Sequence, residues 1–442
     1  MAPSPGPTPS RSLLRNTDFL KLWTAETISV FGSQISALAI PVVAILILHV
    51  SPFEVALLGT IEFLPFILFT LPAGAWVDRL RRRPIMIVGD IGRAIALSSI
   101  PVAFAMNALT IWQLYVVGFI VGTLTVFFDV SNQSYLPSIV DRDDLVEGNS
   151  KLQISQSAAQ IAGPGMAGFL IELVKAPFAI LLDALSFLVS AFFVFLIRKP
   201  EPPIVHAADA AGERRPSIVT EVRQGLSFVL RNPSLRAISA STAASNLFGS
   251  IGFSIYALYA LDQRYLALSP GQLGLVFAIG NVGSLGGAVF ANRLARWFGL
   301  GPTIIGAMFI GGFFMLFVAI APAHEAAIPF LIIGGIFGGI AQMVYNINQV
   351  SYRQAICPPR MQGRMNATVR FLVWGTMPIG SIIGGVLAST IGVHQTIWIS
   401  AVLGFTPAIF PLLSPVRRLR VMPAPVDDET APTGADAPPA TA

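Results

Sequence analysis

Residues 74–84 read GAWVDRLRRRP and join two long apolar segments of the chain. The stretch carries four arginines and one aspartate within a few residues. In membrane proteins, Lys and Arg collect in short loops on the cytoplasmic side, so we predict a membrane hairpin with a cytoplasmic tip. Asp78 would lie where a helix reaches the inner interface. There it would pair with Arg79 or Arg82, or face the positive N-terminal end of another helix.

The composition predicts an integral membrane protein. Of the 442 residues, 54% are hydrophobic and 12% are charged, and the mean hydropathy is +0.71. The net charge of +5 comes from short basic clusters between apolar runs, which argues against a nucleic-acid partner. A single cysteine, Cys357, excludes a disulfide framework, and four scattered histidines offer no metal-ligand spacing. The first apolar segment is too long for a signal peptide, so we expect it to remain as a span.

The apolar runs predict the topology. A helix needs about 20 mainly apolar residues to cross the hydrocarbon core. Twelve runs meet this length, at residues 20–48, 53–77, 84–106, 111–137, 148–174, 177–197, 236–261, 271–294, 302–321, 327–352, 366–391 and 395–414. With a cytoplasmic N-terminus, only Lys175 and Arg264 fall in outer loops. We therefore predict both termini in the cytoplasm, and the excess of Arg over Lys, with abundant Ala, Gly and Pro, suggests a bacterial plasma membrane.

One long break, polar and proline-rich at its start, divides the chain after span six. Its second half places Ile218, Val222, Leu226 and Val229 at three- and four-residue intervals, which predicts a helix lying on the inner membrane face. The predicted organisation is a disordered tail at 1–12, a six-helix bundle at 13–197, a linker at 198–234, a second six-helix bundle at 235–420 and a disordered tail at 421–442.

The two halves resemble copies of one unit. Several short pairs recur in order at nearly constant separation: Arg15-Asn16 as Arg231-Asn232, Ser51-Pro52 as Ser269-Pro270, Arg79-Leu80 as Arg293-Leu294, Asn132-Gln133 as Asn348-Gln349, and Gly163 and Gly168 as Gly380 and Gly385. A duplicated six-helix unit explains this order. We therefore predict an all-α membrane protein of twelve helices in two pseudo-symmetric bundles.

Twelve spans, the duplication, the central linker and the charged hairpin together resemble the major facilitator superfamily over residues 13–420. The family's hairpin motif is matched by Gly74, Asp78, Arg79, Arg82 and Arg83, with Arg81 in place of its second glycine. The second half has Asn292 or Ala291 where the acid would stand, so the resemblance implies a charged gating latch on one side only.

Other stretches resemble the branch that holds macrolide efflux proteins and the enterobactin exporter. They are Leu71-Pro72-Ala73-Gly74, Tyr135-Leu136-Pro137, Gly163-Pro164 with Gly168, and Trp374-Gly375-Thr376-Met377-Pro378. The resemblance implies export of a drug-like compound or siderophore by proton antiport, through alternating access of two halves. A proton-coupled importer and a non-transporting sensor on the same fold remain alternatives. We expect a monomer in the bilayer whose partners are a small-molecule substrate and protons, with no bound cofactor.

Acids inside spans are costly and need a reason. Glu62 lies roughly 14 Å into span two, near the midplane. It is a candidate for proton coupling, with a buried hydrogen-bonded glutamate and a substrate contact as alternatives. Asp90 and Arg93 lie three residues apart on one helix face and either neutralise each other or act in gating. Asp90 and Asp129 are the other two proton-coupling candidates. Asp129 could also receive Arg79 or Arg82, or serve only in helix packing.

The remaining candidates are structural in the first instance. We expect Asp183 to be a satisfied polar group or an ion-pair partner. We expect Arg370 to extend its charge to the inner interface or to form an ion pair. Small residues let helix backbones approach in lipid, which applies to Gly163, Gly168, Gly380, Gly384 and Gly385. Alternatively, Pro164 and these glycines permit a bend or a seal against proton leakage. Aromatic residues that could line an apolar cavity are Trp23, Phe127, Phe128, Tyr256, Tyr259, Tyr345 and Trp374.

An enzymatic or ATP-driven activity has no support in the chain. None of the four lysines follows a glycine, so there is no phosphate-binding loop of the Gly-Lys type. There is likewise no paired Asp cluster, no His-rich site and no elbow serine among glycines. We therefore predict that the protein is not an enzyme.

Overall fold

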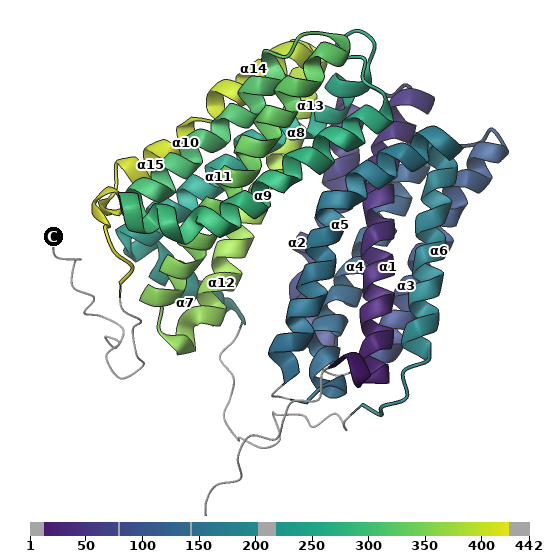
Figure 1. Ribbon diagram of the computed structural model, residues 1–442, viewed down its shortest axis with the longest axis horizontal. Helices are drawn as coiled ribbons and strands as arrows, with labels where there is room; N and C mark the ends of the chain where they lie inside the picture. The colour runs from purple at the N-terminus through teal and green to yellow at the C-terminus, as the bar shows by residue number, and fades with distance from the viewer. Residues whose placement is uncertain (1–12, 78–79, 142–143, 202–217, 424–442) are drawn as a thin grey trace, which may run out of the picture.

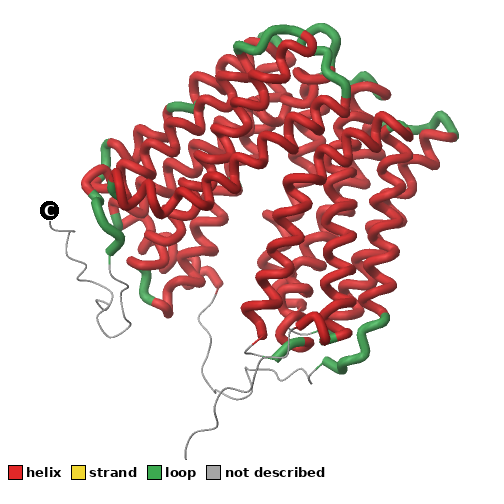
Figure 2. The backbone as a smooth tube through the Cα atoms, in the orientation of Figure 1, coloured by secondary structure: helices red, strands yellow, loops and turns green. Residues whose placement is uncertain are grey.

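A computed structural model describes residues 13–77, 80–141, 144–201 and 218–423. Within these ranges the chain is helical, with no strand (Figure 2). Four predicted features fall outside them: the tail at 1–12, the Asp78-Arg79 pair, the first part of the linker at 202–217 and the tail from residue 424. The described residues contain twelve helices long and apolar enough to cross a membrane, which confirms the predicted number of spans.

The first half contains six long helices and a short 3-10 turn, Leu13–Arg15, before them. The helices are α1 (Thr17–Val42, extended by a π-helical turn, Val43–Ile47), α2 (Pro52–Val77), α3 (Arg82–Ala105), α4 (Ile111–Ile139), α5 (Leu145–Val174) and α6 (Ala176–Phe195). Side-chain caps define several of the starts. Asn16 accepts hydrogen bonds from the backbone N–H groups of Asp18 and Phe19, and Thr110 accepts one from Gln113.

The second half repeats the arrangement with more breaks. Its helices are α8 (Pro233–Leu261), α9 (Pro270–Phe298), α10 (Leu300–Ala319), α11 (Ala327–Ile356), α12 (Pro359–Trp374), α13 (Thr376–Thr390), α14 (Val393–Leu403) and α15 (Ile409–Leu412), with 3-10 turns at His324–Ala326, Thr406–Ala408 and Pro415–Arg418. The spans predicted at 366–391 and 395–414 are confirmed as candidate membrane spans, at Arg364–Thr390 and Val393–Leu412, but each contains a local interruption of the α-helix. The first is interrupted for one residue, at Gly375. In the second, α14 ends at Leu403 and a 3-10 turn follows, because Gly404 and Pro407 disfavour a continuous α-helix.

The helix pairing is the same in both halves. In the first half α1 packs on α5 and α6, α3 on α4 and α6, and α2 on α4. In the second half α8 packs on α13 and α14, α10 on α11 and α14, and α9 on α11. Each pair corresponds to its counterpart along the chain, so the duplication read from the sequence is also a duplication of packing.

The two halves meet at one end and separate at the other (Figure 1). We call the separated end the linker end, because residues 195–201 leave the first half there and α7 (Ile218–Arg231) lies there, and we call the opposite end the far end. The largest buried apolar cluster contains residues of both halves, such as Ile45, Leu58, Tyr256 and Leu273. At the linker end, each half instead has clusters of its own. The core thus joins the halves at the far end only.

A helix is present where the linker pattern predicted one. This helix, α7, packs against α12 and α8, and Val229 in its last turns is fully buried. A Cβ atom added at Gly225 would lie 2.7 Å from the carbonyl oxygen of Arg364 on α12. The helix is therefore docked on the second half.

Candidate functional site

A cavity of about 700 Å³ lies between the halves, mainly on the side of the second half. The first half contributes Gln34, Ala37 and Leu38 from α1 and Pro164 from α5. The rest of the wall comes from α8, α9, α10, α11, α13 and α14. A volume of this size is typical of sites that bind small organic molecules.

The cavity wall is apolar with scattered neutral polar groups. Tyr256 is the centre of an aromatic cluster, with ring centroids 5.5 Å from Phe277, 6.0 Å from Phe314 and 6.3 Å from Phe253. The side-chain amides at the wall are Gln34, Asn246, Asn281 and Gln342, and its methionines are Met308, Met315 and Met377. None of the described lining residues is charged. Such a wall suits an uncharged or weakly polar molecule better than an ion.

One buried polar atom at this wall has no partner. The hydroxyl of Tyr256 makes no hydrogen bond to any described residue, although the residue is only 1% exposed. An unsatisfied buried hydroxyl costs free energy that a bound molecule can recover. Of the aromatic residues predicted as cavity-lining, Tyr256 and Tyr345 occupy the wall of this cavity.

Glu62 does not line the cavity. Its side chain lies between α2 and α4 in the first half, where a Cβ atom added at Gly118 would be 2.8 Å from its Cγ. Within the described ranges no hydrogen bond or ion pair satisfies its carboxyl group. The residue therefore sits on a helix that contacts the second half, but outside the cavity itself.

Asp90 and Arg93 form an ion pair inside the first half. Asp90 is 0% and Arg93 3% exposed. The Arg93 guanidinium lies between two aromatic rings, 4.4 Å from the Phe128 centroid and 4.1 Å from the Phe187 centroid. It also donates a hydrogen bond of 3.4 Å to the Thr125 hydroxyl. The two charges therefore neutralise each other, as one of the two predictions has it. The contacts of Arg93 also join α3 to α4 and α6.

The other predicted acids are placed differently. Asp183 is buried on α6 and accepts hydrogen bonds from Ser36 of α1 and, at 3.1 Å, from Ser186. Asp129 is exposed on α4, and no ion pair links it to Arg82 in the described part of the chain. Arg79 lies outside that part, so the latch stays a prediction. Arg370 is exposed, with its guanidinium 4.8 Å from the centroid of the Trp374 ring.

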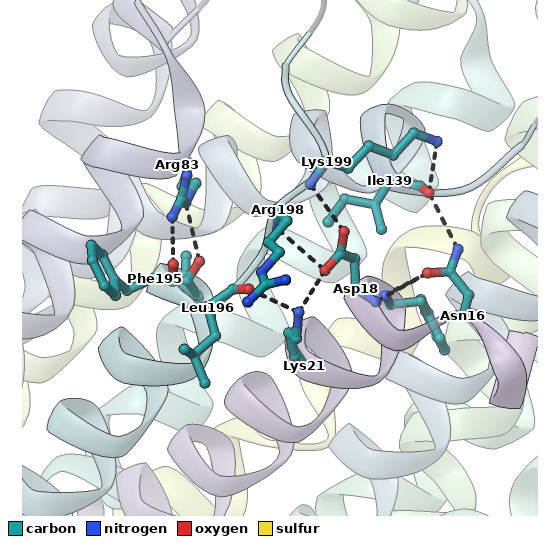
Figure 3. A network of polar contacts seen from close by, with 11 residues as sticks. Asn16, Asp18, Lys21, Arg83, Ile139, Phe195, Leu196, Arg198 and Lys199 are labelled. Carbon is teal, nitrogen blue, oxygen red and sulfur yellow. Dashed lines mark hydrogen bonds and ion pairs between the residues drawn. The ribbon is translucent and has the colours of Figure 1, made fainter.

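The described hairpin arginines bind backbone groups at the linker end. Arg83 donates to the carbonyl oxygens of Val194, at 3.2 Å, and Phe195, where α6 ends (Figure 3). The backbone N–H groups of Arg82 and Arg83 donate to the carboxylate of Glu201 at 2.9 and 2.8 Å. Glu201 thereby places a negative charge at the N-terminus of α3. Gly74 lies in the last turn of α2, in open space.

A second group of contacts fastens the start of the linker to the first half (Figure 3). Asp18 accepts hydrogen bonds from Lys21 and from the backbone N–H groups of Arg198 and Lys199, at 2.8, 3.2 and 3.0 Å. The Lys199 ammonium donates to the carbonyl oxygen of Ile139 at the end of α4, at 2.9 Å. These contacts between α1, α4 and the linker were not predicted from the sequence.

The predicted glycines lie at close helix crossings. Gly163 packs on Gln34 of α1, and its counterpart Gly380 packs on the Leu247 carbonyl of α8, as Gly384 does on that of Ile251. Gly168 and its counterpart Gly385 instead face the opposite half. A Cβ atom added at Gly168 would lie 2.6 Å from the Pro270 carbonyl oxygen, and one added at Gly385 would lie 2.7 Å from the Ala56 Cβ. We call the α5–α9 crossing seam one and the α2–α13 crossing seam two.

The carbonyl oxygen that Pro164 leaves free has an unpredicted partner across seam one. A proline has no N–H group, so Pro164 leaves the carbonyl oxygen of Gln160 without its donor within α5. The side-chain amide of Asn281 on α9 donates to that oxygen at 2.6 Å. The proline itself was the available sequence signal. Asn281 lies 121 residues from Gln160, so this contact could not be predicted from the sequence pattern.

Comparisons with known proteins agree with this architecture. The model of the "Transmembrane secretion effector" family matches residues 8–430. The chain is 26% identical to the multidrug efflux pump Tap of Mycolicibacterium fortuitum, over 77% of this chain and 81% of that protein. It is 24% identical to macrolide efflux protein A of Streptococcus pyogenes, over 91% of this chain and 97% of the relative.

Solved structures show the same fold. A bacterial homologue of the iron transporter ferroportin in its inward-facing state superposes with a TM-score of 0.72 at 18% identity, over 91% of this chain and 99% of the other. The outward-facing state of such a homologue gives 0.53, over 90% and 98%. The family match covers nearly the whole sequence, so this chain belongs to the transmembrane secretion effector family, in the drug-efflux branch of the major facilitator superfamily.

Proposed function

We propose that the protein exports an uncharged or weakly polar organic molecule from the bacterial cytoplasm by proton antiport and alternating access. The observation that carries the proposal is the cavity of about 700 Å³, walled by both halves and free of charged residues in its described lining. The relatives named as efflux pumps support the direction of transport. The free Tyr256 hydroxyl favours substrates with a hydrogen-bonding group.

The proposed orientation puts the linker end in the cytoplasm. The basic residues of the loops support it, because they cluster at that end. The shape supports it too, since the halves are apart at the linker end and the fold is nearer to an inward-facing relative than to an outward-facing one. In this arrangement the cavity takes up its substrate from the cytoplasmic side.

Glu62 is the proposed proton carrier. It is an acid within a span, its carboxyl group has no partner among the described residues, and its helix α2 forms seam two with the second half. One proton entering down about 100 mV releases about 2.3 kcal/mol, and one pH unit adds about 1.4 kcal/mol. The sum of about 3.7 kcal/mol supports a several-hundredfold gradient of a neutral solute. Since Glu62 lies outside the cavity, coupling would act through movement of α2 rather than by contact with substrate.

The test is an accumulation panel in an efflux-deficient bacterial host. We expect cells that produce the protein to exclude uncharged compounds until a protonophore is added, and Glu62→Gln to abolish exclusion. Glu147→Gln is the matched control, because Glu147 pairs with Lys151 at the start of α5, away from the cavity. Accumulation above that of empty cells would indicate an importer. Exclusion by Glu62→Gln equal to wild type would remove Glu62 from the mechanism.

A further inference from the structure

Glu172 closes the far end of seam one. It is the third-last residue of α5, and its carboxylate lies over the first turn of α9 in the other half. It accepts a hydrogen bond from the Ser269 hydroxyl and a second, of 3.0 Å, from the backbone N–H of Gly271. A Cβ atom added at Gly271 would lie 2.5 Å from the carboxylate, so a larger residue here would force the Glu172 carboxylate to shift.

The start of α9 is built to receive this charge. Ser269 and Gln272 form a capping box, in which the Ser269 hydroxyl accepts from the Gln272 N–H at 3.2 Å while the Gln272 side chain accepts from the Ser269 N–H at 2.9 Å. The serine hydroxyl can still donate one hydrogen bond, and it donates to Glu172. The neutral Gln272 leaves the positive helix N-terminus without a carboxylate of its own.

The equivalent positions of seam two carry their carboxylate on a different helix. Ser51 and Glu54 begin α2 where Ser269 and Gln272 begin α9, and the Ser51 hydroxyl donates to Glu54 of its own helix at 2.7 Å. The residue that corresponds to Glu172 is Ser389. The N-terminus of α2 thus receives its carboxylate from within the helix, whereas that of α9 receives it from the opposite half.

We propose that Glu172 is a positioning residue of the transport cycle, which holds the far end shut while the linker end is open. The carboxylate, two donors and the helix N-terminus form one interaction that exists only when α5 and α9 are in contact at the far end. Opening the far end must break it. This inference rests on the proposed alternating access, but the interaction itself can be measured without a substrate.

The test measures distances between the halves by double electron–electron resonance spectroscopy of spin-labelled protein in detergent or lipid. Spin labels go at Ala108→Cys and Ala323→Cys, two exposed positions in far-end loops of different halves, in a Cys357→Ser background. We expect Glu172→Gln to raise the ratio of long to short far-end distances by about three- to tenfold. The matched control Glu54→Gln, whose carboxylate acts within its own helix, should keep the wild-type ratio.

A second variant keeps the test decisive if Glu172→Gln does not insert. The Gln272 amide donates to Glu325 of the same half at 3.2 Å, so the second variant is Gln272→Glu in a Glu325→Gln background. It places a second carboxylate on the first turn of α9, where Glu172 binds, and repulsion should produce the same shift to long distances. An unchanged ratio in both variants, or an equal shift in Glu54→Gln, overturns the proposal. A shift in a protein that moves no compound in the accumulation panel leaves the far-end contact established and rejects the transport function instead.

Discussion

Seams one and two occupy equivalent places between the halves, but they are held differently. Both cross at a glycine, Gly168 in seam one and Gly385 in seam two, that allows helices of opposite halves to approach. Seam one also carries hydrogen bonds on both sides of its crossing, made by Glu172 and Asn281. No hydrogen bond joins α2 to α13 among the described residues.

The contrast extends to individual positions. Asn281 and its carbonyl partner at Gln160 in seam one correspond to Phe63 and Met377 in seam two. Phe63 instead approaches the Trp374 ring, with centroids 6.1 Å apart. Apolar contacts can slide with little change in energy, whereas hydrogen bonds are either made or broken. We infer that seam one carries the discrete steps of the movement and that seam two acts as a sliding contact.

The largest effect should come from filling the glycine crossings, which the two seams share. Valine at Gly168 or Gly385 would force backbones apart at a cost of about 1–3 kcal/mol. That corresponds to an about five- to 150-fold loss of the state closed at the far end. The far-end spin labels measure it. Gly306→Val is the control, because nothing lies within 4 Å of a Cβ atom added there. If only one of the two valine variants lost the state closed at the far end, the two glycine crossings would not contribute equally to it.

A smaller effect, specific to seam one, should come from removing the hydrogen bond at Pro164. Asn281→Leu leaves the Gln160 carbonyl oxygen without a donor, at a cost of about 1 kcal/mol to the closed far end. Pro164→Ala restores an N–H group within α5, so Asn281→Leu should cost little in that background. A double-mutant cycle on the far-end distance ratio measures this coupling. Strictly additive effects would show that Asn281 does not serve the carbonyl that Pro164 leaves free.

The smallest effect should come from adding a carboxylate to seam two. Ser389→Glu would face the start of α2, where Glu54 already lies, and repulsion should weaken the far-end contact by about 0.5 kcal/mol. The double variant Ser389→Glu with Glu54→Gln copies the arrangement of seam one and should restore or strengthen the contact. Equal behaviour of the single and double variants, measured with the same labels, would contradict this account of the two helix starts.

The fold was predictable because a membrane span needs a long apolar helix, and the duplicated residue pairs gave the two halves. The buried Asp90 and Arg93 pair also has a local signal, since residues three apart share a helix face. The local interruptions of the α-helix inside the last two spans were not predicted. A glycine such as Gly375 is tolerated in many continuous helices, so its presence alone does not predict a break.

The contacts between the halves could not be read from the sequence. Glu172 meets Ser269 at a separation of 97 residues, and only the packing of α5 on α9 brings them together. The cavity lies mainly on the side of the second half, although the duplicated sequence treats both halves alike. Glu62 was recognised as an acid in lipid, but its distance from the cavity wall depends on which face of α2 meets α4.

The most direct test of the account is to follow both ends of the protein in one experiment. Labels at Ala108→Cys and Ala323→Cys report the far end. Labels at Val146→Cys, exposed at the start of α5, and Arg296→Cys, exposed at the end of α9, report the linker end. In the presence of an exported compound, alternating access predicts that linker-end distances shorten while far-end distances lengthen. Distances that change together, or at one end only, would contradict two halves that rock about the seams.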